Sequence, residues 1–567
     1  MLSVKRSFGS VFLFRPRSLE FLGWFFWGLC WLLPNHYNPW LNFHSESMAF
    51  GAVALILSRV LIDRPASCEW PSIGIWVLGF AFLPWIQWLS GISLFAGDAV
   101  LTSYFLLGWS GSIFLGYHLA QDETKQAVLS LMHALWVAAM VSAVIGLIQW
   151  LKLEEPLGIY VAQTDFSDPA MGNLAQPNQL ATLLLMGIVA FAYLFERRII
   201  GAFTLGFGVL FMTWVLVMTH SRAGMLGLVA ISTFFLIKRA STSSRIPSHY
   251  IVTWVVVFGV ANVMSPLVDQ ILMLSSGQEP LLTTNGRILI WQRTLAGIYG
   301  SPWVGYGWNQ TTRALMVGAL TYPSEMTFLY AHSVLLDIIA WNGLPLGLTL
   351  IGLGGYWFFT RVHALKGVDA SYAMACALPI IVHSLVEFPF AYAYFLLAAG
   401  LMMGIVEASY HSLGLWRIDR KWTGLALVAW ASLGVYMVHE YLLIEEDYRV
   451  SRFQNLRVGV TEASYKVPEI RVFTHLAAMQ RASRQPPVPG MTAKQLDDLR
   501  RASSRFPHGA LGLRYALALG LNGDPIGASQ MMLVVHHMYG ARFYEAAKEV
   551  WLEKSETNPQ LKAVNIP

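Results

Sequence analysis

Charged residues are scarce in this chain. Asp, Glu, Lys and Arg make up 13% of its 567 residues, whereas about 25% is usual in soluble proteins. Hydrophobic residues make up 55%, and the mean hydropathy is +0.51. So few charges cannot cover the surface of a soluble protein of this length, and we expect most of the chain to face lipid.

The lack of a basic run with aromatic residues and the small number of cysteines narrow the range of possible functions. Lys and Arg form no run interleaved with aromatic residues, which argues against a nucleic-acid partner despite the net charge of +5. Of the 3 cysteines, Cys30 and Cys376 lie in apolar stretches and Cys68 in a short basic loop, a pattern that suggests neither a disulfide framework nor a metal site. We therefore expect no redox chemistry, no metal and no other cofactor.

Apolar runs that can cross a bilayer recur along the chain, each close to the roughly 20 residues that a span needs. The first run is rich in Trp and Phe and has no small-residue cleavage site before Pro34, so we expect a retained helix rather than a signal peptide. The candidates lie near 17–34, 47–62, 71–90, 99–120, 127–151, 179–196, 199–219, 223–237, 249–266, 332–360, 372–388, 391–408 and 422–443. The predicted fold is an all-α, polytopic bundle of about 12–13 transmembrane helices.

Basic residues fall on alternate connections between these spans, and short loops rich in Lys and Arg remain cytoplasmic. The opposite connections, which should face outward, are 35–46, 91–98, 152–178, 219–222, 267–331 and 389–390. They hold nearly all the unusual polar residues, so the sequence predicts one polar face with a long outer loop at 267–331.

The composition turns soluble after the last span. We therefore expect a transmembrane domain at 1–443 and an outward-facing helical domain at 444–567. Residues 493–500 have helical spacing, and Tyr515–Pro525 predicts a helix, a Gly-Asp-Pro turn and the start of another helix. This pair is tetratricopeptide-like, although no repeat period is clear.

His332 ends the long outer loop where a new span begins. Histidine takes up a proton near neutral pH, so it can activate a hydroxyl nucleophile held within hydrogen-bond reach. A single loop histidine is more often an ordinary surface residue, and it is the neighbouring polar residues that favour the catalytic interpretation.

Two arginines share this face. Arg287 lies in the same loop, and Arg222 lies at a tight turn between two apolar spans. A guanidinium group matches phosphate oxygens at two points and keeps its charge, so both suit a lipid diphosphate. For Arg222, snorkelling to the interface or pairing with a carboxylate explains the position equally well.

Two further groups of polar residues lie at span ends. The run 172–182 places Asn173, Gln176, Asn178 and Gln179 at the entry to a span, where amides can bind sugar or phosphate, or Asn178 can cap the helix. His383 and Glu387 are spaced i, i+4, which puts both on one helix face. They can orient a base or bind sugar, or simply pair within the packed bundle.

Together these motifs resemble the bacterial O-oligosaccharyltransferases of the pilin-glycosylating, PglL-type family, relatives of the O-antigen ligases. The resemblance covers essentially the whole chain. Its residues are 34–40 and 43–46 with His36, His44 and Glu46, the run 172–182, Ser221–Gly224, Asn285–Arg287, Ala331–Ser333, and His383–Pro389. Phe388 stands where that family commonly has Tyr, and Ala175 where Gly is common.

The resemblance implies a function and a location. It implies en bloc transfer of an oligosaccharide from undecaprenyl diphosphate to a Ser or Thr hydroxyl of a periplasmic acceptor such as pilin. The enzyme would be a multi-pass protein of the bacterial inner membrane, with its active site facing the periplasm and no metal. His332 would be the base, and Arg222 and Arg287 would bind the diphosphate. Asn285, His383 and Glu387 would bind substrate or support the site. The resemblance implies the same role for the amides of the run 172–182 and for His36, His44 and Glu46 in the N-terminal motif.

Three other functions compete with this one. An O-antigen ligase has the same chemistry but a lipid A core acceptor, and the N-terminal motif and the soluble C-terminal domain argue against it. A polymerase of repeat units is also an enzyme of this kind. A transporter would place polar or broken-helix sites near mid-membrane with internal repeats, whereas here the polar groups gather at one face.

Overall fold

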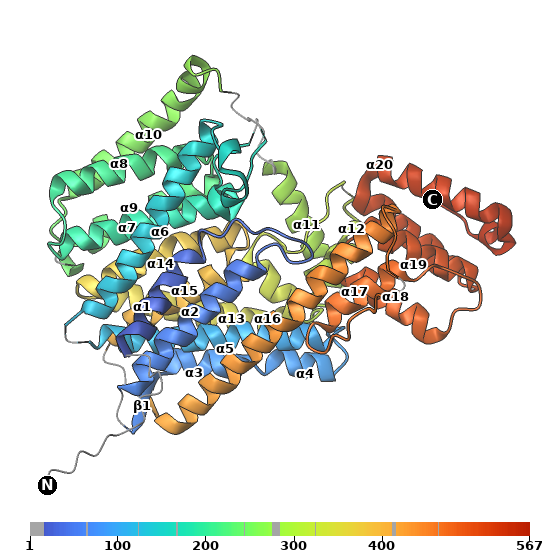
Figure 1. The fold of residues 1–567 in the computed structure, drawn as a ribbon, viewed down its shortest axis with the longest axis horizontal. Coiled ribbons are helices and arrows are strands. Elements are labelled where there is room, and N and C mark those ends of the chain that lie inside the picture. Colours follow the sequence, from blue (N-terminus) through green and yellow to red (C-terminus); the bar gives the residue numbers. More distant parts are fainter. Residues whose placement is uncertain are drawn as a thin grey trace, which may run out of the picture.

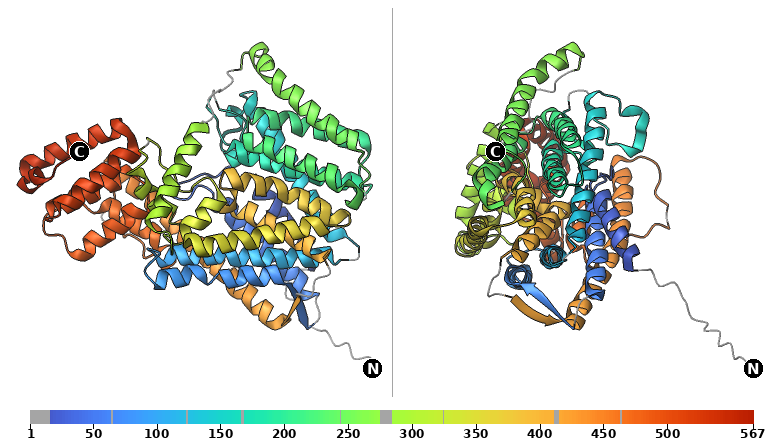
Figure 2. Two further views of the ribbon diagram at one scale, coloured as in Figure 1. Left: turned by 180° about the vertical axis from the view of Figure 1, so that it is seen from behind. Right: turned by 90° about the vertical axis from the view of Figure 1, so that its left-hand side faces the viewer.

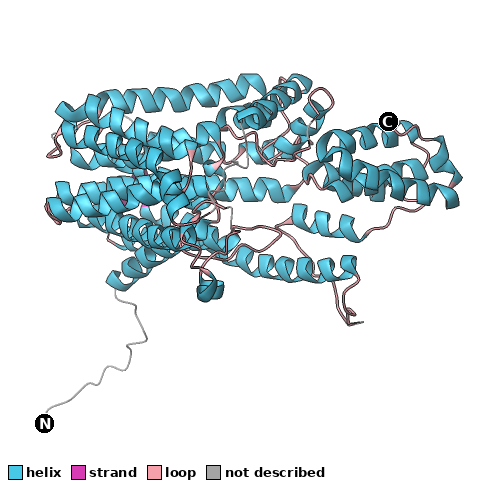
Figure 3. Ribbon diagram, turned by 90° about the horizontal axis from the view of Figure 1, so that it is seen from above, coloured by secondary structure: helices cyan, strands magenta, loops and turns pink. Residues whose placement is uncertain are grey.

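Almost the whole structure is helical. The computed structural model describes residues 16–63, 66–122, 124–165, 168–242, 244–274, 284–323, 325–410, 415–462 and 464–567 (Figure 1). In these ranges the ribbon consists almost wholly of helices and their connections (Figure 3), and the exception is one small sheet of two strands (Figure 2, right). The predicted all-α fold is confirmed.

The helices of the membrane part run from α1 to α16, and α17–α20 follow them. They are α1 (Pro16–Leu29), α2 (Phe43–Ile62), α3 (Ser72–Phe80), α4 (Leu83–Leu89), α5 (Ala96–Ala120), α6 (Gln126–Trp150), α7 (Pro177–Glu196), α8 (Ala202–Met218), α9 (Arg222–Thr242), α10 (Ser248–Ile271), α11 (Thr284–Gly300), α12 (Thr311–Ala319), α13 (Val334–Ala364), α14 (Val368–Val386), α15 (Ala393–Ala408), α16 (Arg420–Leu456), α17 (Thr474–Arg484), α18 (Ala493–Arg505), α19 (Gly509–Leu521) and α20 (Pro525–Thr557). Strands β1 (Ser67–Pro71) and β2 (Leu415–Asp419) pair antiparallel.

Nine helical segments in the described part of the chain are long and apolar enough to cross a membrane. They are α2, α3 with α4, α5, α6, α7, α10, α13, α14 and α16. The four other predicted spans coincide with α1, α8, α9 and α15, so every predicted span corresponds to a helix. The chain is a multi-pass membrane protein.

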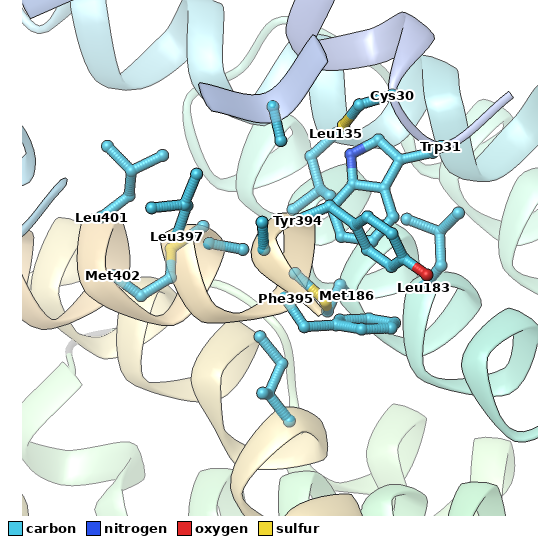
Figure 4. Packing of buried hydrophobic residues seen from close by; sticks show 14 of the residues in the cluster. Cys30, Trp31, Leu135, Leu183, Met186, Tyr394, Phe395, Leu397, Leu401 and Met402 are labelled. Carbon is cyan, nitrogen blue, oxygen red and sulfur yellow. The ribbon is translucent and has the colours of Figure 1, made fainter. Parts of the chain in front are cut away.

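Small residues bring α5 and α15 into close contact at the centre of the bundle. A side chain added at Gly116 would meet the Leu401 backbone, and one added at Gly404 would meet the backbone carbonyl of Ile113. Such close approach is typical of helix pairs in membranes, where van der Waals packing holds helices together. Bulky rings fill the neighbouring space: Trp31 packs edge-on against Tyr394, with ring centroids 5.1 Å apart (Figure 4).

The outer loop predicted at 267–331 is largely helical. It contains the end of α10 and the whole of α11 and α12, while residues 275–283 lie outside the described part. Helices α11 and α12 pack tightly, because Gly318 faces the Arg293 carbonyl and Gly297 faces the Ala314 carbonyl. The segment is thus a structured cover for one end of the bundle.

The Gly-rich segment 300–309 packs against a break in α13. That helix is interrupted at Gly343, whose φ of 74° is left-handed. The Tyr306 amide donates to the Ala340 carbonyl at 2.8 Å, and the Leu344 amide donates to the Pro302 carbonyl at 2.7 Å. A Cβ at Gly305 would come within 2.6 Å of the Ala340 carbonyl, so glycine is needed where the two backbones meet.

The C-terminal helices α17–α20 gather at one end of the bundle, beside α11 and α12 (Figures 1 and 2). The predicted helix, turn and helix are confirmed, since α19 ends at Leu521 and α20 begins at Pro525. Helix α16, however, continues past the expected boundary at 443/444 to Leu456. Its Glu440 carboxylate accepts the Phe473 amide at 2.9 Å, which ties α16 to the start of α17.

A buried ion pair fastens the C-terminal helices to the membrane part. Arg505 at the end of α18 lies 2.9 Å from Asp98 in the first turn of α5, and the Asp98 side chain is fully buried. Gln310 donates to the second Asp98 oxygen at 2.8 Å. Arg293 of α11 is also buried and donates to the backbone carbonyl of His537 in α20 at 3.3 Å. The C-terminal helices therefore hold α11 and α12 as well as α5.

Replacing Arg505 with methionine is expected to destabilise this attachment strongly. Removing one partner of a buried pair leaves an uncompensated charge on Asp98 and costs about 3–5 kcal/mol. Thermal unfolding of the purified protein in detergent measures the effect. The control is Arg500→Met, because Arg500 pairs with Asp497 on the surface, where about half of each side chain is exposed and such pairs contribute about 0.3–0.5 kcal/mol. Equal losses in the two variants would contradict the anchoring role.

Candidate active site

His332 lies in the turn that precedes α13 and is held in a left-handed conformation with φ of 55°. Its side chain is 7% exposed. The Nδ1 nitrogen lies 3.2 Å from the Tyr330 carbonyl, which can accept an N–H from it, and in that neutral tautomer Nε2 keeps its lone pair. Left-handed residues other than glycine cost about 1–3 kcal/mol and gather at functional sites.

Asp337, which the sequence motifs did not single out, builds this turn. Its carboxylate accepts the Ala331 amide at 3.0 Å and the Thr311 hydroxyl at 2.7 Å. It therefore joins the residue before His332 to the start of α12. The signal that could have found it is a carboxylate in the first turn of an apolar helix, where it satisfies free amides.

Glu387 connects the base candidate to an arginine. One carboxylate oxygen lies 2.5 Å from Nη2 of Arg287, and the other lies 3.4 Å from Nε2 of His332. All three side chains are largely buried, with exposed fractions of 4%, 17% and 7% for Glu387, Arg287 and His332. The Nε atom of Arg287 is buried and has no hydrogen-bond partner among the described residues. Arg287 therefore has one N–H donor that no described residue engages.

Burial sets the protonation of His332. It lowers the pKa of the imidazole below its ordinary 6.5, although the Glu387 carboxylate pulls the pKa upward. The neutral ring, which can accept a proton, therefore predominates at neutral pH. Glu387 lies where it would stabilise the imidazolium once a proton is taken up.

A chain of hydrogen bonds brings two more motifs to this carboxylate. Asn178 of α7 donates through Nδ2 to Glu387 at 3.4 Å, and its Oδ1 accepts the Ser221 hydroxyl at 2.7 Å. Ser221 is followed directly by Arg222, the first residue of α9, whose side chain is exposed. Motifs from α7, the α8–α9 turn, α11, α13 and the end of α14 thus meet at one place.

The remaining amides of the 172–182 run have mainly structural partners. Asn173 is buried, and its side chain binds the backbone of Leu32, Tyr160 and Ala162. Gln179 accepts the Tyr394 hydroxyl at 2.7 Å. Gln176 is the residue before α7 and is partly exposed.

The expectation that Asn178 caps α7 is wrong. The helix begins one residue earlier, at Pro177, with Gln176 at the N-cap position and no side-chain cap. Proline suits the first turn because it lacks an N–H that would need a partner there. This register turns the Asn178 side chain toward Glu387 and Ser221.

His383 and Glu387 do not share a helix face. Helix α14 ends at Val386, and Glu387 is extended, with φ of −153°. Its side chain turns to Arg287 and His332, while Nδ1 of His383 lies 2.8 Å from the Thr182 hydroxyl. The premature end of the helix separates the two residues that the i, i+4 spacing had paired.

The residues of the N-terminal motif, 34–40 and 43–46, lie in three different places. Nε2 of His36 donates to the Asn173 carbonyl at 2.8 Å, and His44 lies 3.2 Å from Glu445 of α16. Glu46 is buried in the first turn of α2. The Asn285 side chain lies outside the described part of the structure. The first two contacts fasten the outer segments to the helices around the site.

Phe388 stacks in an aromatic column beside the site. Its ring lies 5.1 Å from that of Tyr330 and 5.8 Å from that of Tyr392, and it meets the His332 ring edge-on at 4.8 Å. Two tyrosines therefore flank the position where the resembling family has its own. The column forms an apolar wall for His332.

Family comparisons match the parts that meet at this site. A family described as O-antigen ligase matches residues 207–351, which include Arg222, Arg287 and His332. A family described as protein glycosylation ligase matches 170–195, and one described as virulence factor membrane-bound polymerase, C-terminal, matches 371–553. The chain is a membrane glycosyltransferase.

Curated relatives confirm the resemblance to the O-oligosaccharyltransferases. A general O-oligosaccharyltransferase of Acinetobacter baylyi is 29% identical over 496 residues, which cover 83% of this chain and 84% of the relative. A ComP-specific O-oligosaccharyltransferase of the same organism is 26% identical over 393 residues, 68% of this chain and 70% of the relative. These relatives support O-linked glycan transfer to protein and an enzyme rather than a transporter.

Proposed function

We propose that this protein transfers an oligosaccharide en bloc from undecaprenyl diphosphate to a Ser or Thr hydroxyl of a periplasmic acceptor such as pilin. The hydroxyl oxygen bonds to the first sugar carbon, and the bond from that carbon to the diphosphate breaks with its electron pair leaving on the lipid diphosphate. Nε2 of His332 takes the hydroxyl proton. Arg222 and Arg287 bind the diphosphate and stabilise its growing charge.

The observation that carries this proposal is the bridge made by Glu387. Its two oxygens reach Arg287 at 2.5 Å and His332 at 3.4 Å. A donor held by Arg287 would therefore present its sugar close to the base. Transfer between two bound substrates requires such proximity, because held reactants avoid most of the entropic cost of meeting.

Glu387 has a defined part in this scheme. When the proton of the neutral His332 ring is on Nδ1, where the Tyr330 carbonyl can accept it, Nε2 is the nitrogen that takes up the hydroxyl proton. The imidazolium that forms then lies beside a carboxylate, which Arg287 holds in place from the other side. Asn173, Gln176, Asn178, Gln179, Asn285, His383, His36, His44 and Glu46 are proposed to support the site or to bind substrate.

We place the enzyme in the bacterial inner membrane with this site on the periplasmic face. The proposal rests on the basic connections, which alternate with the polar ones along the chain. Residues 1–443 are proposed to form the transferase domain, and 444–567 a periplasmic helical domain. The contact of Arg505 with Asp98 and that of the His537 carbonyl with Arg293 favour a role in holding α5 and α11 in place.

The test is transfer in cells that lack their own transferase. The protein is expressed with a defined lipid-linked glycan and a candidate pilin, and the intact mass of the pilin is measured. We expect a mass increase of one whole glycan. Lipopolysaccharide from the same cells is examined in parallel: glycan on lipid A core with unmodified pilin would overturn the proposal and support an O-antigen ligase, the function named by the family matched at residues 207–351.

A further inference from the structure

Three consecutive polar residues, Gln310, Thr311 and Thr312, are fully buried where α12 begins. Gln310 donates to Asp98 of α5 at 2.8 Å, and Thr311 donates to Asp337 of α13 at 2.7 Å. Thr312 donates to the last two backbone carbonyls of α18 at 3.2 and 3.1 Å. A polar side chain away from water is costly unless it is hydrogen-bonded. These residues therefore fix the start of α12 to three other helices.

Asp337 extends the contact of Thr311 to the turn that carries the base. Its Oδ1 atom accepts both the Thr311 hydroxyl and the Ala331 amide, the latter at 3.0 Å. Ala331 directly precedes His332, whose backbone is left-handed with φ of 55°. A residue other than glycine stays in this conformation only where its surroundings hold it. The hydrogen bond from Ala331 to Asp337 is such a hold, one residue away from the imidazole.

The Thr311 hydroxyl has a further partner in α13. It accepts the indole N–H of Trp341 at 2.7 Å, so Trp341, Thr311 and Asp337 form a chain of hydrogen bonds. Hydrogen bonds in such a chain strengthen one another in a water-poor interior. The Trp341 ring is buried, and its centroid lies 6.5 Å from that of Tyr330 and 6.1 Å from that of Phe390. The chain is thus enclosed by the aromatic residues around the base.

Asp337 makes these contacts through one of its two oxygens. Both hydrogen bonds go to Oδ1, while Oδ2 is buried and has no hydrogen-bond partner among the described residues. The oxygen of an asparagine side chain can accept the same two hydrogen bonds without a charge. Leucine, which is similar in size, can accept neither. Substitution by these two residues therefore separates hydrogen bonding by Asp337 from mere filling of space.

We propose that Asp337 and Thr311 are positioning residues for the base, and that residues 310–312 fix them to the C-terminal helices. This inference rests on the proposed function, in which His332 is the base. Both residues act through Ala331 and keep the imidazole buried beside Glu387. A displacement of about 1 Å in a catalytic group can lower a rate by about 10²-fold. The C-terminal helices would then contribute to the rate of transfer as well as to stability.

The first test compares two substitutions of Asp337 in the purified enzyme with a defined lipid-linked donor. We expect Asp337→Leu to lower kcat by about 10²-fold. The KM for the donor should stay unchanged, because Arg222 and Arg287 are not altered. Asp337→Asn should recover most of the loss in kcat, because its side-chain oxygen accepts the same hydrogen bonds.

The pH dependence of the variants separates positioning from a loss of stability. Burial lowers the pKa of His332, while Glu387 from the end of α14 raises it and Arg287 from α11 lowers it. A looser turn admits water to the imidazole, which weakens the effect of burial and raises this pKa. Transfer by Asp337→Leu should therefore begin to decline at a higher pH than transfer by the wild type. A loss of stability alone would reduce the amount of active enzyme and leave that pH unchanged.

Hydrogen–deuterium exchange tests the hold on the turn without any transfer. The peptide that contains Ala331 should exchange faster in Asp337→Leu than in the wild type. Thr311→Val removes only the hydroxyl and should change the exchange rate and the pH dependence in the same direction. Thr312→Val should do so to a smaller extent. The control is Thr349→Val, because Thr349 lies on α13 but is exposed, and its hydroxyl bonds to a carbonyl of its own helix.

Several results would overturn the proposal. Wild-type kcat or wild-type exchange in Asp337→Leu would do so, as would an Asp337→Asn enzyme that is equally impaired. Wild-type behaviour of Thr312→Val would overturn the connection to the C-terminal helices. Thermal unfolding shows whether each variant is folded, and Thr311→Val decides the question if Asp337→Leu is not. Absence of transfer by the wild type would instead reject the proposed function, while the exchange measurement would still test the contact with Ala331.

Discussion

Replacing His332 with alanine is expected to lower the rate of glycan transfer by about 10²–10⁴-fold, the usual contribution of a general base. Binding of the lipid-linked donor should survive, because Arg222, Arg287 and the nearby amides are unchanged. The rate is measured by intact mass of the acceptor at matched expression. His363→Ala is the control, since His363 is exposed at the far end of the same helix.

The pH dependence of glycan transfer is a second test of His332 as the base. Because burial lowers the pKa of His332, the ring loses its base form only as the pH falls through a value below 6.5. Transfer should therefore persist at pH 6.5 and decline at lower pH. Glu387→Gln removes a carboxylate that raises this pKa, so the activity of this variant should begin to decline at still lower pH.

Full transfer activity in His332→Ala would refute the assignment of His332 as the base and leave His383 as the next candidate.

Replacing Arg287 with lysine is expected to lower transfer by about 10²–10³-fold, the cost of removing one donor that stabilises transition-state charge. In the structure Nη2 of Arg287 holds Glu387 at 2.5 Å, while Nε has no partner among the described residues. A guanidinium can therefore keep Glu387 and still reach a phosphate oxygen. A lysine ammonium is a point charge and cannot span both groups in that way.

The measurement is the initial rate with a defined donor at matched expression. Arg449→Lys is the control, because Arg449 is 61% exposed and its ion pair is with Glu446 on the same helix, far from the site in the chain. Wild-type turnover in Arg287→Lys would show that the planar, two-sided contact is not needed. A loss equal to that of the control would have the same meaning.

The apolar runs predicted the helices well because lipid leaves backbone groups no partners outside a helix. Their alternation with basic loops also predicted that His332, Arg287 and Glu387 lie toward one end of the bundle. The i, i+4 spacing of His383 and Glu387 could not predict where α14 ends. Had the helix continued past Val386, Glu387 would have faced His383 rather than Arg287.

The sequence did not predict helices α11 and α12, which cover one end of the bundle, for a different reason. Residues 284–319 are polar enough to suggest a loop, and their helices depend on contacts with each other and with the C-terminal helices. Gly297 and Gly318 allow α11 and α12 to touch, and Arg293 reaches the His537 carbonyl. Such contacts join residues far apart in the chain, which a local pattern does not contain.

Helix α16 is much longer than a membrane span needs. Its 37 residues span about 56 Å at 1.5 Å per residue, whereas the hydrocarbon core is about 30 Å thick. The helix is bound to α17 through Glu440, and α18 is bound to α5 through Arg505. A change in the tilt of α16 relative to α5 would therefore act on the C-terminal helices and, through the His537 carbonyl and Arg293, on α11.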